Sequence, residues 1–193
     1  IFKDNEGIKT FSLLTRRASS KVYYIDGYDV VQAGNDLANK LEKKGITVDH
    51  ITQKFDVVYD NSYFNSRKVL QKVNLNNYDL VIDLHRDAAS STITAKDVYG
   101  NDISKLMFVH STEQSNSKKQ CEITDSLRSF GTVFSDDMIR DDWNYDYGIS
   151  HFNQDLNDNV ILVENGFNTN TRDQVNRSNT YLAAIIEKFI KNL

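Results

Sequence analysis

The sequence lacks proline, has a single cysteine and contains no apolar run long enough to cross a membrane. With one thiol, Cys121, no disulfide can form within the chain, and we expect that thiol to be a partly buried group on a helix rather than a nucleophile. Charges interrupt the most hydrophobic segment, residues 182–193, which excludes a transmembrane span there.

A basic surface is also missing. The formal net charge is -4, which gives no electrostatic reason to expect nucleic acid as a partner. Lysine and arginine are scattered, and runs such as KLEKKG and SNSKKQ are typical of solvated faces. With 39% hydrophobic and 26% charged residues, the composition is that of an ordinary globular protein.

The length of 193 residues suits one domain with a sizeable core. We expect residues 1–10, which are polar, to be a leader or an edge segment, and residues 11–193 to form the domain. Because the chain begins at Ile1 rather than methionine, we expect it to be a trimmed or processed product. Any upstream signal or anchor would then lie outside the sequence.

Apolar periodicity alternates along the chain between two kinds. Helical spacing predicts helices over 31–44, 63–73, 121–134 and 171–193, the last beginning at Thr171 as its N-cap. Short apolar runs predict strands over 46–48, 80–84, 106–109 and 160–163. Strands separated by helices indicate an α/β fold: a single domain with a mostly parallel, twisted sheet and helices on both faces.

Two of these strands end on ionisable groups. The run VIDLH delivers His85, and VILVE delivers Glu164 just before Gly166, where glycine permits a sharp turn. Sites in α/β sheets gather beyond the carboxyl ends of strands, so both groups are expected at one edge. An imidazole is a good zinc ligand, and a carboxylate whose pKa is raised by burial suits a general base. The alternative is a satisfied polar histidine and a capping or salt-bridging acid.

Several motifs in this order resemble the stage II sporulation protein P family of cell-wall hydrolases. They are NSYFNSRKVL (61–70), VIDLHRDA (81–88), KLMFV (105–109), FNQDLN (152–157) and ILVENG (161–166). That family is related to zinc-dependent N-acetylmuramoyl-L-alanine amidases, whose final strand resembles LVENGFNTNTRD here. The resemblance covers nearly all of the chain after about residue 11.

The resemblance implies an amidase-like α/β fold, one zinc ion and cleavage of the amide that joins muramic acid to the stem peptide. Members remodel septal peptidoglycan during engulfment of the forespore, outside the cytoplasmic membrane to which an N-terminal segment anchors them. By this resemblance His85 corresponds to a metal ligand within DLHRD, and Glu164 corresponds to the catalytic general base.

The first strand departs from the family pattern. The family's remaining ligands come from a motif resembling H-T-H-x-x-E-S, which corresponds here to LTRRASS, residues 14–20. The ligand positions then hold Leu14, Arg16 and Ser19. None of these binds zinc well: leucine has no donor atom, and a protonated guanidinium repels a cation. We therefore expect no bound zinc, and Arg16 is a candidate to fill the vacated position and pair with Glu164.

Other histidines offer a rearranged site. His50 is expected to end a short strand, and His110 and His151 are expected near the same sheet edge as His85. An active zinc amidase built from His85, His110 or His151, with Glu164 as base, is therefore the alternative to a degenerate domain.

The remaining family-like residues predict a substrate groove. Tyr63 and Arg67 are candidates to line it, and Arg86 is expected either to contact substrate or to form a local ion pair with Asp87. Asn153 and Gln154 are expected in a polar loop across the cleft. The aromatic loop residues are candidates to stack on sugar rings, at least one of them serving local packing instead: Trp143, Tyr145 and Tyr147.

Two functions remain open at this level. The first is a degenerate amidase-like domain that binds peptidoglycan or another cell-envelope protein without zinc. The second is an active amidase with a rearranged metal site. Both place the chain outside the cytoplasm, anchored through a segment absent from this sequence. The sequence does not indicate an oligomeric state.

Overall fold

The computed structural model describes residues 9–16, 25–54 and 59–193. Its strands are β1 (Lys9–Arg16), β2 (Thr47–Lys54), β3 (Leu80–Asp87), β4 (Thr94–Lys96), β5 (Asp102–Ser104), β6 (Leu106–Ser111), β7 (Trp143–Tyr145) and β8 (Val160–Phe167). Its helices are α1 (Val30–Glu42), α2 (Tyr59–Leu70), α3 (Ser117–Gly131) and α4 (Arg172–Lys191), with 3₁₀ segments η1 (Leu75–Asn77) and η2 (Ile149–Leu156).

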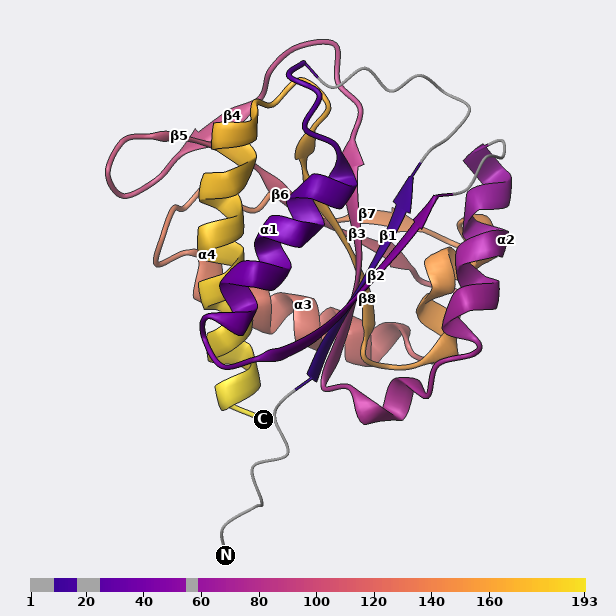
Figure 1. Cartoon of the computed structure of the whole chain (residues 1–193). Coiled ribbons are helices and arrows are strands. Elements are labelled where there is room, and N and C mark those ends of the chain that lie inside the picture. The colour runs from indigo at the N-terminus through magenta and orange to yellow at the C-terminus, as the bar shows by residue number, and fades with distance from the viewer. Residues whose placement is uncertain (1–8, 17–24, 55–58) are drawn as a thin grey trace, which may run out of the picture.

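One six-stranded sheet organises the fold, in the order β2-β1-β3-β8-β6-β7 (Figure 1). The four strands β2, β1, β3 and β8 run parallel, as the alternation of strands and helices predicts. Strand β6 runs antiparallel to β8, and β7 continues parallel to β6. Strands β4 and β5 form a separate hairpin. The predicted α/β fold with a mostly parallel sheet is therefore confirmed.

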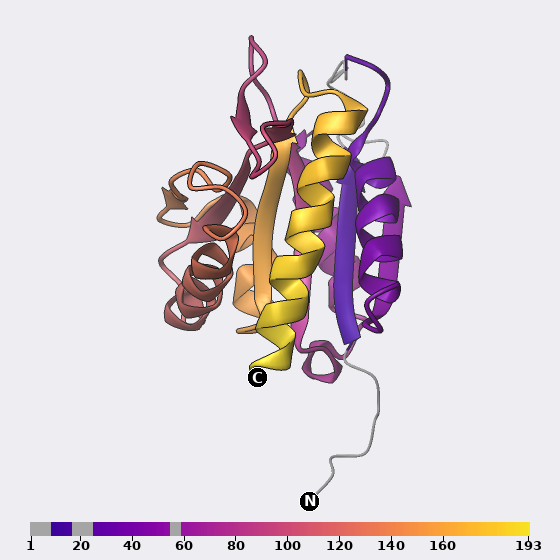
Figure 2. The same ribbon diagram turned by 90° about the vertical axis from the view of Figure 1, so that its left-hand side faces the viewer.

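The two faces of the sheet are covered by different helices. Helices α1 and α4 lie side by side on one face, where α3 joins them (Figure 2). Their apolar residues pack on alternate residues of the central strands, such as Leu84 and Val163. The other face carries α2 and η2, which contribute Tyr63 and Phe152 to a smaller cluster with Leu162. This smaller cluster leaves room for a site on the α2 face.

Local sequence signals explain where the helices begin. Asp29 accepts a hydrogen bond from the amide of Gln32, and the Gln32 side chain accepts one from the amide of Asp29 in return. Thr171 and Gln174 form the same capping box at α4, which confirms the predicted N-cap. Such boxes satisfy amides that the first helical turn leaves without intrahelical partners.

The strands are longer than their apolar runs. Strand β2 continues to Lys54, so His50 lies within the strand rather than at its end, and that prediction was wrong. Strand β3 likewise continues beyond His85, which leaves the imidazole inside the sheet near its carboxyl edge. Among the described residues, no helix has the length and apolarity needed to cross a membrane.

Candidate functional site

His85 and Glu164 are register partners on the adjacent parallel strands β3 and β8. Partners in a parallel ladder project to the same face, here the face covered by α2 and η2. Both side chains are buried, with 5% and 7% of their surface exposed. Strand β6 places Met107 beside Glu164 from the other side. The predicted meeting of His85 and Glu164 at one sheet edge is therefore confirmed.

Two neighbours fix the imidazole of His85. Its Nε2 lies 2.8 Å from Oδ1 of Asp83, a carboxylate two residues earlier on the same face of β3 and almost fully buried. The ring of Tyr63 stacks on the imidazole, with 5.6 Å between ring centroids and 15° between planes. His85 is thus held by an acid in the strand and by an aromatic ring from α2.

A cavity of about 290 Å³ opens over this face. We call it the groove. Glu164 lines the groove together with apolar residues of β6 and β8 and with four aromatic residues, which we call the aromatic wall: Tyr63, Trp143, Tyr145 and Phe152. The remaining lining residues are Asp87, Met107, Val109, Arg140 and Leu162. Tyr145 makes an edge contact with Phe152, 5.2 Å between centroids, so the wall is continuous. Tyr63, Trp143 and Tyr145 all line this cavity, and the stacking of the two loop aromatics on sugar rings stays a prediction. The third aromatic, Tyr147, lies instead against His151.

One ion pair lies in the lining of the groove. Arg140 donates a 2.9 Å hydrogen bond to Oδ2 of Asp87, at the carboxyl end of β3. Its guanidinium stacks over the ring of Phe167, 4.4 Å from the centroid. No sequence pattern indicates a role for Arg140, because it lies in an acidic loop without helical or strand periodicity.

Strand β8 continues beyond Glu164 to Phe167, with a register irregularity against β3 at this point, so the sharp turn predicted at Gly166 was wrong. Gly166 nevertheless has φ +72°, a backbone conformation that favours glycine. A Cβ there would lie 2.6 Å from the Cβ of Ser104 and 2.8 Å from the amide oxygen of Asn170. Only glycine fits this position, which brings β8 close to the β4–β5 hairpin while Glu164 keeps its place over the groove.

The degenerate ligand positions lie in or after β1. Leu14 is the register partner of Leu84 on β3 and therefore stands one residue short of the level of His85. Arg16 is the partner of Lys54 on β2. Ser19 lies outside the described residues. A pairing of Arg16 with Glu164 stays a prediction.

The donors around His85 do not fit the zinc ion that the family implies. Across 9–16, 25–54 and 59–193, no group of three histidine, cysteine, aspartate or glutamate side chains could hold a metal. One nitrogen of His85 already faces Asp83. A catalytic zinc site needs three protein ligands and an open fourth position.

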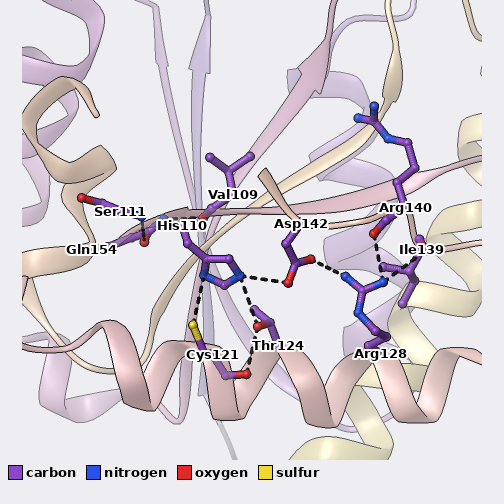
Figure 3. A network of polar contacts seen from close by, with 10 residues as sticks. All are labelled: Val109, His110, Ser111, Cys121, Thr124, Arg128, Ile139, Arg140, Asp142 and Gln154. Atoms are coloured by element: carbon purple, nitrogen blue, oxygen red, sulfur yellow. Dashed lines mark hydrogen bonds and ion pairs between the residues drawn. The ribbon is translucent and has the colours of Figure 1, made fainter. Parts of the chain in front are cut away.

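The prediction that His110 lies near His85 was wrong. Because β6 is antiparallel to β8, its carboxyl end lies at the opposite edge of the sheet. His110 also projects to the α3 face, where its Nε2 lies 3.2 Å from Asp142 and its Nδ1 lies 3.9 Å from the Cys121 sulfur (Figure 3). Asp142 is also paired with Arg128. Cys121 is partly exposed on α3, as predicted, and burial raises its thiol pKa.

His151 also lies away from His85, because it contacts the carboxyl end of the antiparallel strand β6. Its Nδ1 lies 2.9 Å from the hydroxyl of Ser111, at the carboxyl end of β6. The predicted rearranged site draws on His85, His110 or His151, and the structure brings neither His110 nor His151 to His85.

Arg86 is buried and bonds main-chain carbonyls, an environment that its neighbours in the sequence do not indicate. The expected ion pair with Asp87 is wrong, since Asp87 pairs with Arg140. Only 3% of Arg86 is exposed, and its guanidinium donates to the main-chain carbonyls of Tyr28, Phe167 and Asn170. It joins loops at the carboxyl edge of the sheet, on the face opposite the groove, and offers no exposed group to a substrate there.

The other predicted substrate contacts are also engaged within the protein. Arg67 donates to both carboxylate oxygens of Asp155, at 2.7 and 2.6 Å. Asn153 is fully buried and bonds the Ser66 hydroxyl. Gln154 is 1% exposed and accepts from the amide of Ser111. Asn153 and Gln154 lie buried in η2 rather than in a polar loop across the cleft, so that prediction was wrong. Arg67, on α2, is held by Asp155 of η2.

The family follows from comparison of the whole sequence. The sequence model described as stage II sporulation protein P matches residues 15–187. The chain belongs to the stage II sporulation protein P family. A relative from Bacillus subtilis (strain 168), itself named stage II sporulation protein P, is 27% identical over 154 residues, 74% of this chain. That match spans 34% of the relative, so the chain corresponds to about a third of its length.

Solved structures place this family member in the amidase-like fold. The N-acetylmuramyl-L-alanine amidase Ami1 from Mycobacterium abscessus aligns with a TM-score of 0.58 at 9% identity, over 96% of this chain and 98% of its own. The CwlD amidase from Clostridioides difficile, solved in complex with the GerS lipoprotein, aligns with a TM-score of 0.54 at 14% identity, over 95% and 97%. At such identities the likeness shows the fold alone.

Proposed function

We propose that this chain is an amidase-like domain that has lost zinc and acts by binding the cell wall. The groove, which Glu164 lines, receives part of the peptidoglycan. The domain works outside the cytoplasm, and an upstream segment anchors it to the membrane, as in the family it belongs to. A cell-envelope protein is the alternative occupant, which the CwlD structure with its lipoprotein partner supports by analogy.

The proposal that zinc has been lost rests on the groups that surround the His85 imidazole. Its Nε2 is engaged by the buried carboxylate of Asp83, and the only other histidines whose side chains the structure describes, His50, His110 and His151, do not adjoin it. The sequence positions that correspond to the remaining family ligands hold Leu14, Arg16 and Ser19. A single imidazole without two further donors does not hold zinc at useful affinity.

The geometry of the groove supports binding of a glycan or peptide. Its wall consists of aromatic side chains, and Trp143 and Tyr145 remain 56% and 44% exposed. Exposed rings next to a cavity offer flat apolar faces on which a sugar ring packs. Trp143 and Tyr145 lie on β7, which the register fixes against β6. Because β7 is part of the sheet, the wall is preorganised for a ligand.

The test combines metal analysis with binding. Purified protein, after incubation with zinc and desalting, is analysed for zinc and then sedimented with purified sacculi. We expect zinc far below one equivalent together with co-sedimentation. Stoichiometric zinc would overturn the loss of metal, and failure to sediment would overturn the binding role.

The retained pairing of His85 with Glu164 favours one second candidate, an active amidase. It predicts release of stem peptides from sacculi and loss of that release in Glu164→Gln. Glu122→Gln, which alters an exposed glutamate on α3 outside the groove lining, is the matched control. Sacculi left undigested in the presence of zinc would exclude this candidate.

A further inference from the structure

We propose that Arg140 is an anchor for a carboxylate group of a peptide bound in the groove. The inference rests on the proposed binding function and names the chemistry that the groove selects. Arg140 combines three features: a fixed position, hydrogen-bond donors left over after its contacts within the protein, and a place in the lining of the cavity.

The position of Arg140 is fixed by its backbone and by its ring contact. Its amide donates a 2.8 Å hydrogen bond to the carbonyl of Leu106 on β6, and its own carbonyl accepts one of 2.9 Å from Arg128. Figure 3 shows the Arg140 side chain extending away from Arg128 and Asp142. The guanidinium then stacks over Phe167. A cation held in this way loses little conformational freedom when it binds an anion.

Some of the hydrogen-bond donors of Arg140 are not used within the protein. A guanidinium carries five N–H groups in a planar fork. The terminal nitrogen Nη2 donates to Asp87, whereas the other terminal nitrogen, Nη1, has no hydrogen-bond acceptor among the described residues. Nε is buried and is not available to a ligand. A carboxylate binds such a fork through two parallel hydrogen bonds, which makes it the preferred ligand of an incompletely used arginine.

The remainder of the lining strengthens this interaction and restricts the ligand. Most of the other lining residues are apolar or aromatic, so the effective dielectric constant is lower than in water. The two other ionisable residues in the lining, Asp87 and Glu164, are both acidic. A ligand with one carboxylate at Arg140 and a neutral or amine group toward Glu164 is complementary, whereas a second anion beside Glu164 is repelled.

Two substitutions with opposite expected effects test the anchor. The probe is N-acetylmuramyl-L-alanyl-D-isoglutamine, an acid with one free carboxylate on its peptide, compared with the diamide in which that carboxylate is also amidated, and binding is measured by titration calorimetry. We expect the wild type to bind the acid about tenfold more tightly than the diamide, and Arg140→Gln to abolish this preference. Asp87→Asn removes the competing carboxylate, so it should bind the acid at least as tightly as the wild type.

The direction of the Asp87→Asn effect separates an anchor from a structural ion pair. If the pair only stabilises the loop, both substitutions weaken binding of acid and diamide alike, and the proposal is wrong. Arg177→Gln is the matched control, because Arg177 bonds the carbonyl of Asp102 outside the groove lining. Equal wild-type affinity for acid and diamide, with sedimentation on sacculi intact, would refute the anchor alone; loss of sedimentation would refute the proposed function as well.

Discussion

His85 and Glu164 stand opposite one another on adjacent parallel strands, and both project onto the face that α2 and η2 cover. A zinc amidase needs this arrangement to place a ligand beside a base. Here the nitrogen Nε2 of the imidazole faces Asp83 instead. Glu164 lines the groove, while His85 lies on the neighbouring strand with its imidazole stacked on the ring of Tyr63.

The first prediction concerns Asp83. Its carboxylate is 1% exposed and is the partner of the His85 imidazole. Asp83→Ala removes the carboxylate that His85 contacts and leaves the buried imidazole without that contact. We therefore expect the free energy of unfolding to fall by about 3 kcal/mol. Urea denaturation measures the change. Asp79→Ala, at an exposed position just before β3, is the control and should change stability little. Equal stabilities of the two variants would contradict the structural role of Asp83.

The second prediction concerns Asp142, which joins His110 on β6 to Arg128 on α3 (Figure 3). Trp143 of β7 follows it directly, so the network anchors the segment that carries the aromatic wall. Asp142→Ala should lower the free energy of unfolding by about 1–2 kcal/mol and weaken binding to sacculi. The neighbouring Asp141 is exposed, which makes Asp141→Ala a close control. Unchanged thermal stability and binding in Asp142→Ala would show that the network does not support the wall.

The site was predictable where local sequence determines geometry. The runs VIDLH and VILVE both end parallel strands, and the common direction of those strands brings His85 and Glu164 together. The run LMFVH looks the same locally, but its strand is antiparallel. Strand direction depends on the connection through the β4–β5 hairpin and on the rest of the sheet, which no local pattern contains. His110 was therefore assigned to the wrong edge.

The partners of the charged residues were less predictable than the fold. Arg86 and Asp87 are adjacent in sequence, but successive strand residues project to opposite faces. Arg86 accordingly reaches main-chain carbonyls in the segments that precede α1 and α4, while Asp87 meets Arg140 in the groove. Arg140 is 53 residues away from Asp87 in sequence, and only the completed sheet brings them together. Amphipathic periodicity fixes the layers but carries no information about such pairs.

The third prediction concerns Trp143, whose ring is 56% exposed beside the groove. If the aromatic wall packs on a sugar ring, Trp143→Ala should weaken binding to sacculi several-fold and change the free energy of unfolding by less than about 0.5 kcal/mol. Tyr99 is 81% exposed at the tip of the β4–β5 hairpin and outside the groove lining. Tyr99→Ala is therefore the control, and an equal loss of binding in both variants would indicate nonspecific adhesion.

The last prediction concerns acid stability. Asp97 closes the turn between β4 and β5, where it accepts hydrogen bonds from the amides of Tyr99 and Asn101 and from the hydroxyl of Tyr181 on α4. Burial acts to raise its pKa, but these hydrogen bonds outweigh that effect and lower the pKa from 3.8 to about 2. A carboxyl group whose pKa is lower in the folded protein than in the unfolded protein contributes its full stabilisation at pH values above its unfolded-state pKa. That stabilisation is lost as the pH falls from 3.8 toward 2.

Asp97→Asn should therefore be less stable than the wild type at pH 6, and the difference should shrink as the pH is lowered through this window. Urea denaturation of both proteins at pH 6, 3.5 and 2 measures it. Asp173→Asn is the control, because Asp173 lies exposed in the first turn of α4, and its difference from the wild type should not follow the same course. A difference for Asp97→Asn that stays constant down to pH 2 would mean that the turn holds without the ionised carboxylate. The hairpin would then depend on the Tyr181 contact and on packing against α4, and its position beside Gly166 would be independent of pH.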